Sequence, residues 1–215
     1  MSVIIDNLPL YLEGFGMTLF LLVITVVIAL PLGIVVAAMR ISPVASLRAT
    51  GAVYTEIARN TPLTLIFFFF TFVVPRLGIV LDFRIGALCA LILYTAPFFA
   101  EAIRSGVNSV PVGQAEAARS IGLTFTQTVG LVVLPQAIRS VIPPLVNVMI
   151  ALTKNTSVAT GFFVFTLVSA GQRLANANGD QVITVLLGVA FFYLIITIPL
   201  GQFADWFEKR VAVPR

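Results

Sequence analysis

Glu116–Pro135 (EAARSIGLTFTQTVGLVVLP) is a polar, small-residue stretch lodged between long apolar segments. Pro111, just before it, can begin a helix, because the N–H that proline lacks has no partner in a first helical turn anyway. Gln114–Ile121 is a short run that favours helix, and Gly122 can end it in the left-handed conformation. The stretch therefore predicts a short helix across the membrane surface, available for docking in a groove on a partner.

Composition places the chain in a membrane. Of its 215 residues 59% are hydrophobic and 10% charged, and the mean hydropathy is +1.07. A bilayer accommodates this apolar surface, whereas a soluble domain cannot bury it. The net charge is only +4 and the basic residues are scattered, which argues against nucleic-acid binding.

Several classes of chemistry are excluded by what the sequence lacks. Cys89 is its one cysteine and histidine is absent, so a disulfide scaffold, a histidine-bound zinc and a His-based catalytic triad are ruled out. The phosphate-binding pattern G-x-x-x-x-G-K-[ST] is absent too, so the chain is not itself an ATPase. An intramembrane enzyme is disfavoured for the same reasons. The N-terminus carries Asp6 and Glu13 and shows no removable signal peptide.

Five segments have the roughly 20 mostly apolar residues that a helix needs to cross the hydrocarbon core. They are Phe15–Met39, Ala52–Val74, Ile85–Val107, Val129–Leu152 and Val182–Phe203. Pro135, Pro143 and Pro144 predict kinks or breaks in the fourth span. We therefore expect an all-α membrane protein with a single transmembrane domain over residues 1–215.

Lys154–Asp180 alternates polar runs with an apolar core, Val158–Val168. That core is too short to span a bilayer. Irregular backbone at membrane depth is tolerated only inside protein or beside a water-filled cavity. We expect a re-entrant or half-buried helix that lines the centre of the molecule.

Basic residues near the ends of the spans predict the topology, since cytoplasmic loops carry an excess of them. With the N-terminus outside and the C-terminus in the cytoplasm, nine basic residues lie in the cytoplasm and four outside. The cytoplasmic ones are Arg40, Arg48, Arg59, Arg104, Arg119, Arg139, Lys209, Arg210 and Arg215, and the outer ones are Arg76, Arg84, Lys154 and Arg173. The same topology places Glu116 in the cytoplasm.

The opening stretch resembles the cytoplasmic signature of bacterial ABC-importer permeases. That signature has Glu-Ala-Ala, three residues, Gly, nine residues and then aliphatic-x-Leu-Pro; Val132 stands where isoleucine is usual. The matching positions are Glu116, Ala117, Ala118, Gly122, Leu134 and Pro135. Ala58–Phe70, Ala100–Ala118 and Leu134–Asn147 extend the resemblance to the polar amino-acid branch, which takes up histidine, glutamine and glutamate. Asn60 departs from it, because glycine is common there.

This resemblance implies the type I importer permease fold, with five transmembrane helices and a cytoplasmic coupling helix, in the bacterial plasma (inner) membrane. It implies a second permease, identical or similar, a cytoplasmic ATPase that binds the ATP and Mg²⁺, and an extracytoplasmic substrate-binding protein. No cofactor is expected in this chain. The signature residues would couple it to the ATPase, and the binding protein would dock around Pro75–Ile85 and Gln172–Gln181. A self-sufficient secondary transporter or channel is the alternative function, and it would not depend on an ATPase.

Two acid–base pairs stand three residues apart on predicted helices, which permits salt bridges. They are Glu56 with Arg59 and Glu101 with Arg104, and we interpret both as structural. The phenylalanines at 67–70 and 191–192 suggest an aromatic gate or, in the interpretation we favour, packing between helices and against lipid.

Lys154, Asn155, Thr156 and Ser157 bring a positive charge and hydrogen-bond donors to the end of a proline-containing span. Such groups suit the α-carboxylate of a free amino acid and predict a substrate path. The alternative is a lysine that reaches the outer interface.

The residue at position 166 is a second indication of which amino acid is transported. The resembling family commonly has Lys-Asp-Thr-Ser, eight residues and Glu-Leu; here Asn155 and Thr166 replace the two acids. The resemblance implies that such an acid pairs with the side chain of basic substrates. Because an unmatched buried charge is costly, we expect glutamate, or else aspartate or glutamine. The alternative is a passive channel with specificity wholly in the binding protein.

Overall fold

The computed structural model describes residues 2–211, which form helices and connections without a strand. In chain order the α-helices are α1 (Ser2–Asp6), α2 (Leu8–Ile41), α3 (Ala45–Asn60), α4 (Leu63–Phe68), α5 (Phe83–Asn108), α6 (Val112–Ser120), α7 (Phe125–Gln127), α8 (Leu134–Asn155), α9 (Leu167–Ala177) and α10 (Val182–Val211). Two π-helical turns, η1 (Phe69–Val73) and η3 (Thr128–Val133), and two 3₁₀ segments, η2 (Val74–Leu77) and η4 (Thr156–Phe162), complete the chain. Arg215, one of the residues that predict the topology, lies outside the described residues.

Four helical segments are long and apolar enough to cross a membrane, and a bent pair makes a fifth if it counts as one span. The four are Leu8–Ile41, Phe83–Asn108, Phe125–Phe162 and Val182–Arg210. The predicted second span, Ala52–Val74, is not one straight helix, because the chain bends by 98° between α3 and α4. Pro62 causes the break: its ring disfavours helical backbone at Thr61, which is extended at φ −88° and ψ 129°.

Pro75 and Pro135 each follow a π-helical turn closely, η1 in one case and η3 in the other. A proline ring clashes with the carbonyl four residues before it, and a wider turn moves that carbonyl aside. By contrast, α8 continues through Pro143 and Pro144. The irregularity predicted for the fourth span therefore lies ahead of Pro135.

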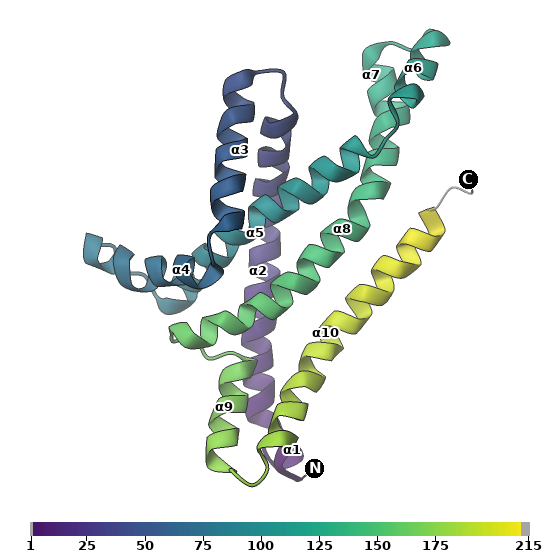
Figure 1. The fold of residues 1–215 in the computed structure, drawn as a ribbon. Helices are drawn as coiled ribbons and strands as arrows, with labels where there is room; N and C mark the ends of the chain where they lie inside the picture. Colours follow the sequence, from purple (N-terminus) through teal and green to yellow (C-terminus); the bar gives the residue numbers. More distant parts are fainter. Residues whose placement is uncertain (1, 212–215) are drawn as a thin grey trace.

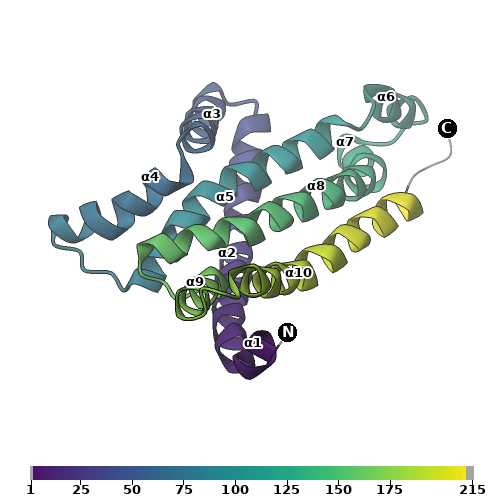
Figure 2. The ribbon, with the colours of Figure 1, turned by 60° about the horizontal axis from the view of Figure 1, so that its bottom comes forward.

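The two ends of the molecule are built differently (Figure 1). The N-terminus, α9 and the start of α10 lie at one end, and α6, α7, the α2–α3 connection and the C-terminal end of α10 lie at the other. Between these ends α5, α8 and α10 run side by side across α2 (Figure 2). Helix α5 is central, since it packs against α2, α3 and α8.

Small residues allow α2 and α5 to cross closely. Ala29, Gly33 and Ala37 of α2 are buried against the region of α5 that contains Ala96 and Ala100. A Cβ atom added at Gly33 would stand 2.7 Å from Cβ of Phe99 and 2.9 Å from the Ala96 carbonyl oxygen. In lipid the hydrophobic effect does not drive helices together, so their association relies on close van der Waals packing. Small residues such as these allow that close approach.

A glycine also allows α5 and α8 to approach closely. A Cβ at Gly106 of α5 would lie 2.2 Å from a methyl group of Val141 and 3.0 Å from its backbone nitrogen. Gly171 of α9 meets the side chain of Val189 of α10 in the same way, at 2.4 Å. At each of these three crossings an added methyl group on the glycine would clash with the neighbouring helix.

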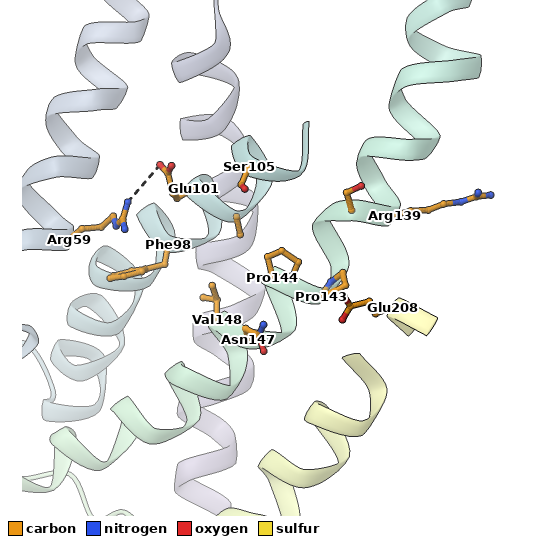
Figure 3. Close-up of a pocket in the computed structure, with 12 residues that line it drawn as sticks. Arg59, Phe98, Glu101, Ser105, Arg139, Pro143, Pro144, Asn147, Val148 and Glu208 are labelled. Atoms are coloured by element: carbon orange, nitrogen blue, oxygen red, sulfur yellow. Dashed lines mark ion pairs between the residues drawn. The ribbon is translucent and has the colours of Figure 1, made fainter. Parts of the chain in front are cut away.

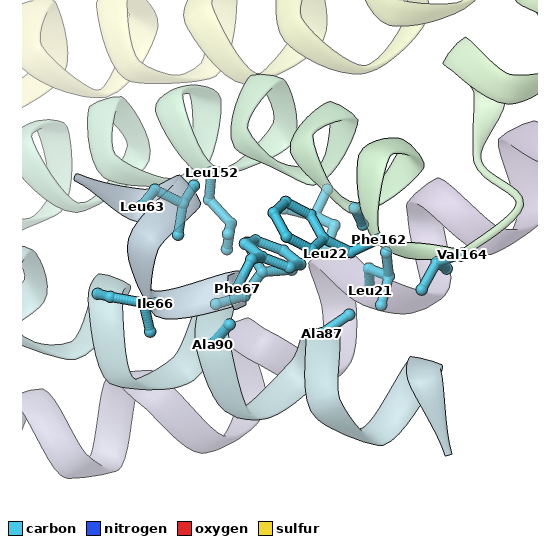
Figure 4. Packing of buried hydrophobic residues seen from close by; sticks show 12 residues of the cluster. Leu21, Leu22, Leu63, Ile66, Phe67, Ala87, Ala90, Leu152, Phe162 and Val164 are labelled. Atoms are coloured by element: carbon cyan, nitrogen blue, oxygen red, sulfur yellow. The ribbon is translucent and has the colours of Figure 1, made fainter. Parts of the chain in front are cut away.

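A hydrophobic cluster joins α2, α4, α5 and η4 (Figure 4). Phe67 is fully buried and stacks on Phe162 of η4, with 5.0 Å between ring centroids. Leu21 and Ala90 close the cluster from α2 and α5. The interpretation of Phe67 as a packing residue is confirmed, while Phe68 faces outward with half its surface exposed.

The segment after α8 holds a helix, but not over the apolar run that was expected to form it. Residues 156–162 are 3₁₀, Phe163 is left-handed at φ 64°, and α9 begins at Leu167. A capping box of Thr166 and Ser169 starts α9. Helix α9 packs against α2 and α10 at the end that carries α1, whereas η4 packs into the hydrophobic cluster with α2, α4 and α5. Only part of the segment therefore has the central place that was expected for it.

Glu101 ties three helices together. Its carboxylate accepts hydrogen bonds from Arg40 of α2 and Arg104 of α5, and Arg59 of α3 lies 3.8 Å away. The predicted pair of Glu101 and Arg104 therefore forms. The pair of Glu56 and Arg59 does not form within residues 2–211: Arg59 turns toward Glu101, and the Glu56 carboxylate accepts from the Asn60 amide at 3.3 Å.

We expect Gly33→Ala to destabilise the permease by about 1–3 kcal/mol, the cost of overpacking a tight contact. The matched control is Gly16→Ala on the same helix, where an added methyl meets nothing within 4 Å. Samples are heated to a series of temperatures, and size-exclusion chromatography then measures the fraction of protein that stays monodisperse. Equal midpoints for the two variants would contradict the α2–α5 crossing.

We expect Glu101→Gln to cost about 2–3 kcal/mol, less than the roughly 3–5 kcal/mol of a fully buried pair because the arginines remain partly solvated. Glu56→Gln, one turn from Arg59 on the exposed side of α3, is the control and should change little. The same heating assay tests both. Indistinguishable profiles would mean that the carboxylate does not hold α2, α3 and α5 together.

Candidate functional site

A cavity of about 940 Å³ lies between α5 and α8 (Figure 3). Helix α5 contributes Phe98, Glu101, Ala102 and Ser105; α8 contributes Arg139, Ser140, Pro143, Pro144, Asn147 and Val148; Arg59 of α3 and Glu208 of α10 complete the lining. The cavity therefore takes residues from four helices that are far apart in the sequence.

Charged groups stand on both sides of this cavity. Arg59 lies over the ring of Phe98 at 5.4 Å and faces Glu101 across 3.8 Å, so a cation–π contact and an ion pair hold it at the rim. On the other side Glu208 lies beside Pro143, and Arg139 extends away from Glu101 (Figure 3). The cavity thus offers both signs of charge around an aromatic wall.

A second cavity of about 380 Å³ continues the first, because the two share Phe98, Asn147 and Val148. It extends to Tyr94 on α5 and to Asn155 at the end of α8. Ser140, Asn147 and Asn155 are spaced so that one face of α8 presents them all. A polar stripe therefore runs along the α5–α8 seam from Glu101 to Asn155.

This arrangement suits binding and passage rather than bond chemistry. The arginines can hold a carboxylate, and the amides and hydroxyls can accept or donate hydrogen bonds. Within residues 2–211 no group of three or more His, Cys, Asp or Glu side chains could hold a metal ion. What the stripe can do is solvate a small polar molecule inside a membrane protein.

The five predicted substrate-path residues are not brought together. Asn155 lines the smaller cavity, whereas Lys154 is exposed. Thr156 is buried and donates to the Thr153 carbonyl at 2.7 Å, and Ser157 donates to that of Lys154. Their hydroxyls are thus paired with backbone carbonyls one turn earlier.

Thr166 is fully buried and serves a structural purpose. Its hydroxyl shares a hydrogen bond with Thr160, and its backbone N–H donates to the hydroxyl of Ser169 at 3.0 Å. The adjacent N–H of Leu167 donates to the hydroxyl of Thr18 on α2. Thr166 therefore caps α9 and joins it to α2.

Sequence reasoning missed the polar residues of α8 that do line the cavity, Ser140 and Asn147. Their spacing from Asn155 was the available signal, since positions 140, 147 and 155 recur on one helical face. Glu208 carried no such signal, because only the tertiary fold brings α10 to the cavity.

The predicted docking helix is present as α6. Pro111 is extended and precedes it, and Gly122 follows it in the left-handed region at φ 92°. Two backbone bonds close its end: Leu123 N–H to the Ala118 carbonyl at 3.2 Å, and Gly122 N–H to that of Arg119 at 3.0 Å. This pattern is the Schellman motif.

The two faces of α6 differ. Ala118 is buried, and α6 packs there against η3. Glu116 and Ala117 are exposed, and so are Gly122 and Leu134 beyond the helix; Pro135 is half-buried at the start of α8. Three large apolar side chains around α6 are left mostly exposed: Val112 at 73%, Ile121 at 81% and Phe125 at 71%.

The family profile described as "Binding-protein-dependent transport system inner membrane component" matches residues 29–213. The chain is 43% identical over 211 residues to the probable glutamine ABC transporter permease protein GlnM of Bacillus subtilis, covering 98% of this chain and 97% of that one. It is 38% identical over 222 residues to the glutamate transport system permease protein GluC of Corynebacterium efficiens, covering 96% of each.

Among solved structures, the chain is similar to a crystal structure of an amino acid ABC transporter with histidines. The TM-score is 0.88 at 26% identity, over 96% of both chains. The expected type I importer permease fold is therefore confirmed. The chain belongs to the family of inner-membrane components of binding-protein-dependent transport systems, as a non-catalytic ABC transporter permease subunit.

Proposed function

We propose that this chain forms one half of the translocation path of an ATP-driven amino-acid importer and that α6 couples the path to a cytoplasmic ATPase. The observation that carries the proposal is the position of α6, which stands exposed at one end of the molecule in the connection between α5 and α8, the two helices that contribute most of the cavity lining. The relatives named for glutamine and glutamate transport support an amino acid as cargo.

The coupling follows from how α6 is attached. Only residues 109–111 separate it from α5, and α6 packs against η3, which leads into α8. A push on α6 therefore reaches both walls of the cavity. The exposed apolar residues Val112, Ile121 and Phe125 supply the contact surface for the ATPase, and Glu116 supplies a charge. ATP and Mg²⁺ belong to the partner.

The remaining parts of the assembly follow from the two ends of the fold. In a bacterial inner membrane, the end with α6 lies on the cytoplasmic side and the end with α9 lies on the outer side, as the basic residues predict. The binding protein docks on that outer end, near Pro75–Ile85 and Gln172–Gln181. A second permease, identical or similar, closes the path on its open side.

For the cargo we propose glutamate, with aspartate or glutamine as alternatives. Asn155 lines the cavity where the resembling family commonly has an acid, so a cationic side chain finds no carboxylate there. Glu101 does not supply one, because three arginines already surround it. Thr166 does not contribute to this selectivity, since its side chain caps α9.

We expect Glu116→Lys to lower ATP-dependent uptake several-fold in proteoliposomes that hold the permease with its ATPase and binding protein, because the charge facing the ATPase is reversed. Asp205→Lys is the control: it makes the same charge change at an exposed site near the same end. Equal loss in both variants, or uptake without any ATPase, would contradict the coupling role. The second outcome would favour a self-sufficient transporter.

We expect wild-type complex to take up labelled glutamate or glutamine and to exclude arginine, and Asn155→Asp to admit arginine. The new carboxylate would pair with a cationic side chain that otherwise pays its desolvation alone. The binding protein must be the same in all reactions, and it should be one that delivers both kinds of amino acid. Unchanged selectivity would place specificity in the binding protein.

A further inference from the structure

An apolar groove of about 580 Å³ lies between α2 and the middle of α10, and it shares no lining residue with the α5–α8 cavity. Its lining includes Leu19, Val23 and Val27 of α2, Ile195 and Pro199 of α10, and Met149 of α8 at its base. The ribbons of α2 and α10 diverge toward the C-terminal end of α10 (Figure 1).

The groove lies at hydrocarbon depth. Both walls belong to spans of high mean hydropathy, 3.1 for α2 and 2.5 for α10. Val23 and Val27 keep 53% and 61% of their surface exposed, so they are open to whatever surrounds the helices. Bilayer lipid surrounds a membrane span, and an unfilled apolar slot there loses van der Waals contacts.

Helix α10 continues the groove with residues typical of a membrane interface. Pro199, Phe203, Trp206 and Arg210 recur at helical spacing on one face. Phe203 lies 6.1 Å from Trp206, and the Arg210 guanidinium lies over the Trp206 ring at 4.7 Å. Tryptophan and arginine at a span end are interfacial anchors.

The length of α10 from Pro199 to Arg210 matches half the thickness of the hydrocarbon core. From Pro199 to Arg210 the helix rises about 16 Å at roughly 1.5 Å per residue, close to half of the ~30 Å hydrocarbon core. The nearby acids do not cancel Arg210 on this face: Glu208 lines the α5–α8 cavity, and the helical period turns Asp205 to another side.

We propose that this groove is a binding site for one anionic phospholipid, with an acyl chain between α2 and α10 and the headgroup phosphate at Arg210. A guanidinium binds phosphate oxygens in a forked geometry. Because the choline of phosphatidylcholine neutralises its phosphate, the cationic Arg210 favours a headgroup with net negative charge. The apolar walls select the chain. The site is independent of the transported substrate and of the ATPase.

The test uses the full-length chain in phosphatidylcholine nanodiscs that contain phosphatidylglycerol with a diazirine midway along one acyl chain. After illumination, mass spectrometry locates the adducts. We expect adducts on residues 19–27 and 195–200, several-fold more than from phosphatidylcholine with the same labelled chain. Val23→Phe should fill the groove and remove these adducts, whereas Leu187→Phe, exposed elsewhere on α10, should not.

Two matched variants of the protein test the contact with the headgroup. Arg210→Gln should abolish the preference for phosphatidylglycerol, and Lys209→Gln, the same charge loss on a neighbouring face, should retain it. Equal labelling from both lipids with no response to Val23→Phe would overturn the proposal and leave only non-selective boundary lipid. Labelling at Leu187 without labelling in the groove would also overturn it and would indicate that a second copy of the chain covers the groove.

Discussion

The carboxylate of Glu101 determines how three helices meet, because Arg40 of α2, Arg59 of α3 and Arg104 of α5 all reach it. An acid within a membrane span is costly unless it is paired. The helices that supply its partners are therefore held at one level. Arg59 is also part of the cavity lining, so the same ion cluster that holds α3 beside α5 sets the charge at the rim of the candidate path.

Close helix crossings make the rest of the scaffold rigid. Gly33 brings α2 onto one side of α5, and Gly106 brings α8 onto another, with no space at either for a methyl group. The close contact at Gly106 joins α5 to α8, and the cavity beside Phe98 and Asn147 lies along the same seam. Helix α6 follows α5 after three residues and packs against η3, which leads into α8.

Local features of the chain were predictable because they depend on neighbours in the sequence. The helix of the signature stretch, its left-handed end at Gly122 and the pairing of Glu101 with Arg104 follow from turn chemistry and helical spacing. Features that depend on distant contacts were not. Glu56 and Arg59 have suitable spacing, but Glu101 lies closer to Arg59 in space. Thr166 occupies a position of interest in the sequence, yet its hydrogen bonds with Thr160 and Ser169 place it at the start of α9 as a cap.

The sequence by itself determined that the chain is helical, that it lies in a membrane and that a short exposed helix follows Pro111, because apolar length, charge and turn residues are properties of short segments. The tertiary structure alone decided which polar residues share a cavity, where the second span bends and where α9 lies. Those outcomes depend on which faces of distant helices meet. In lipid, small residues and a few charges far apart in the chain select those faces, and hydrophobic pattern does not.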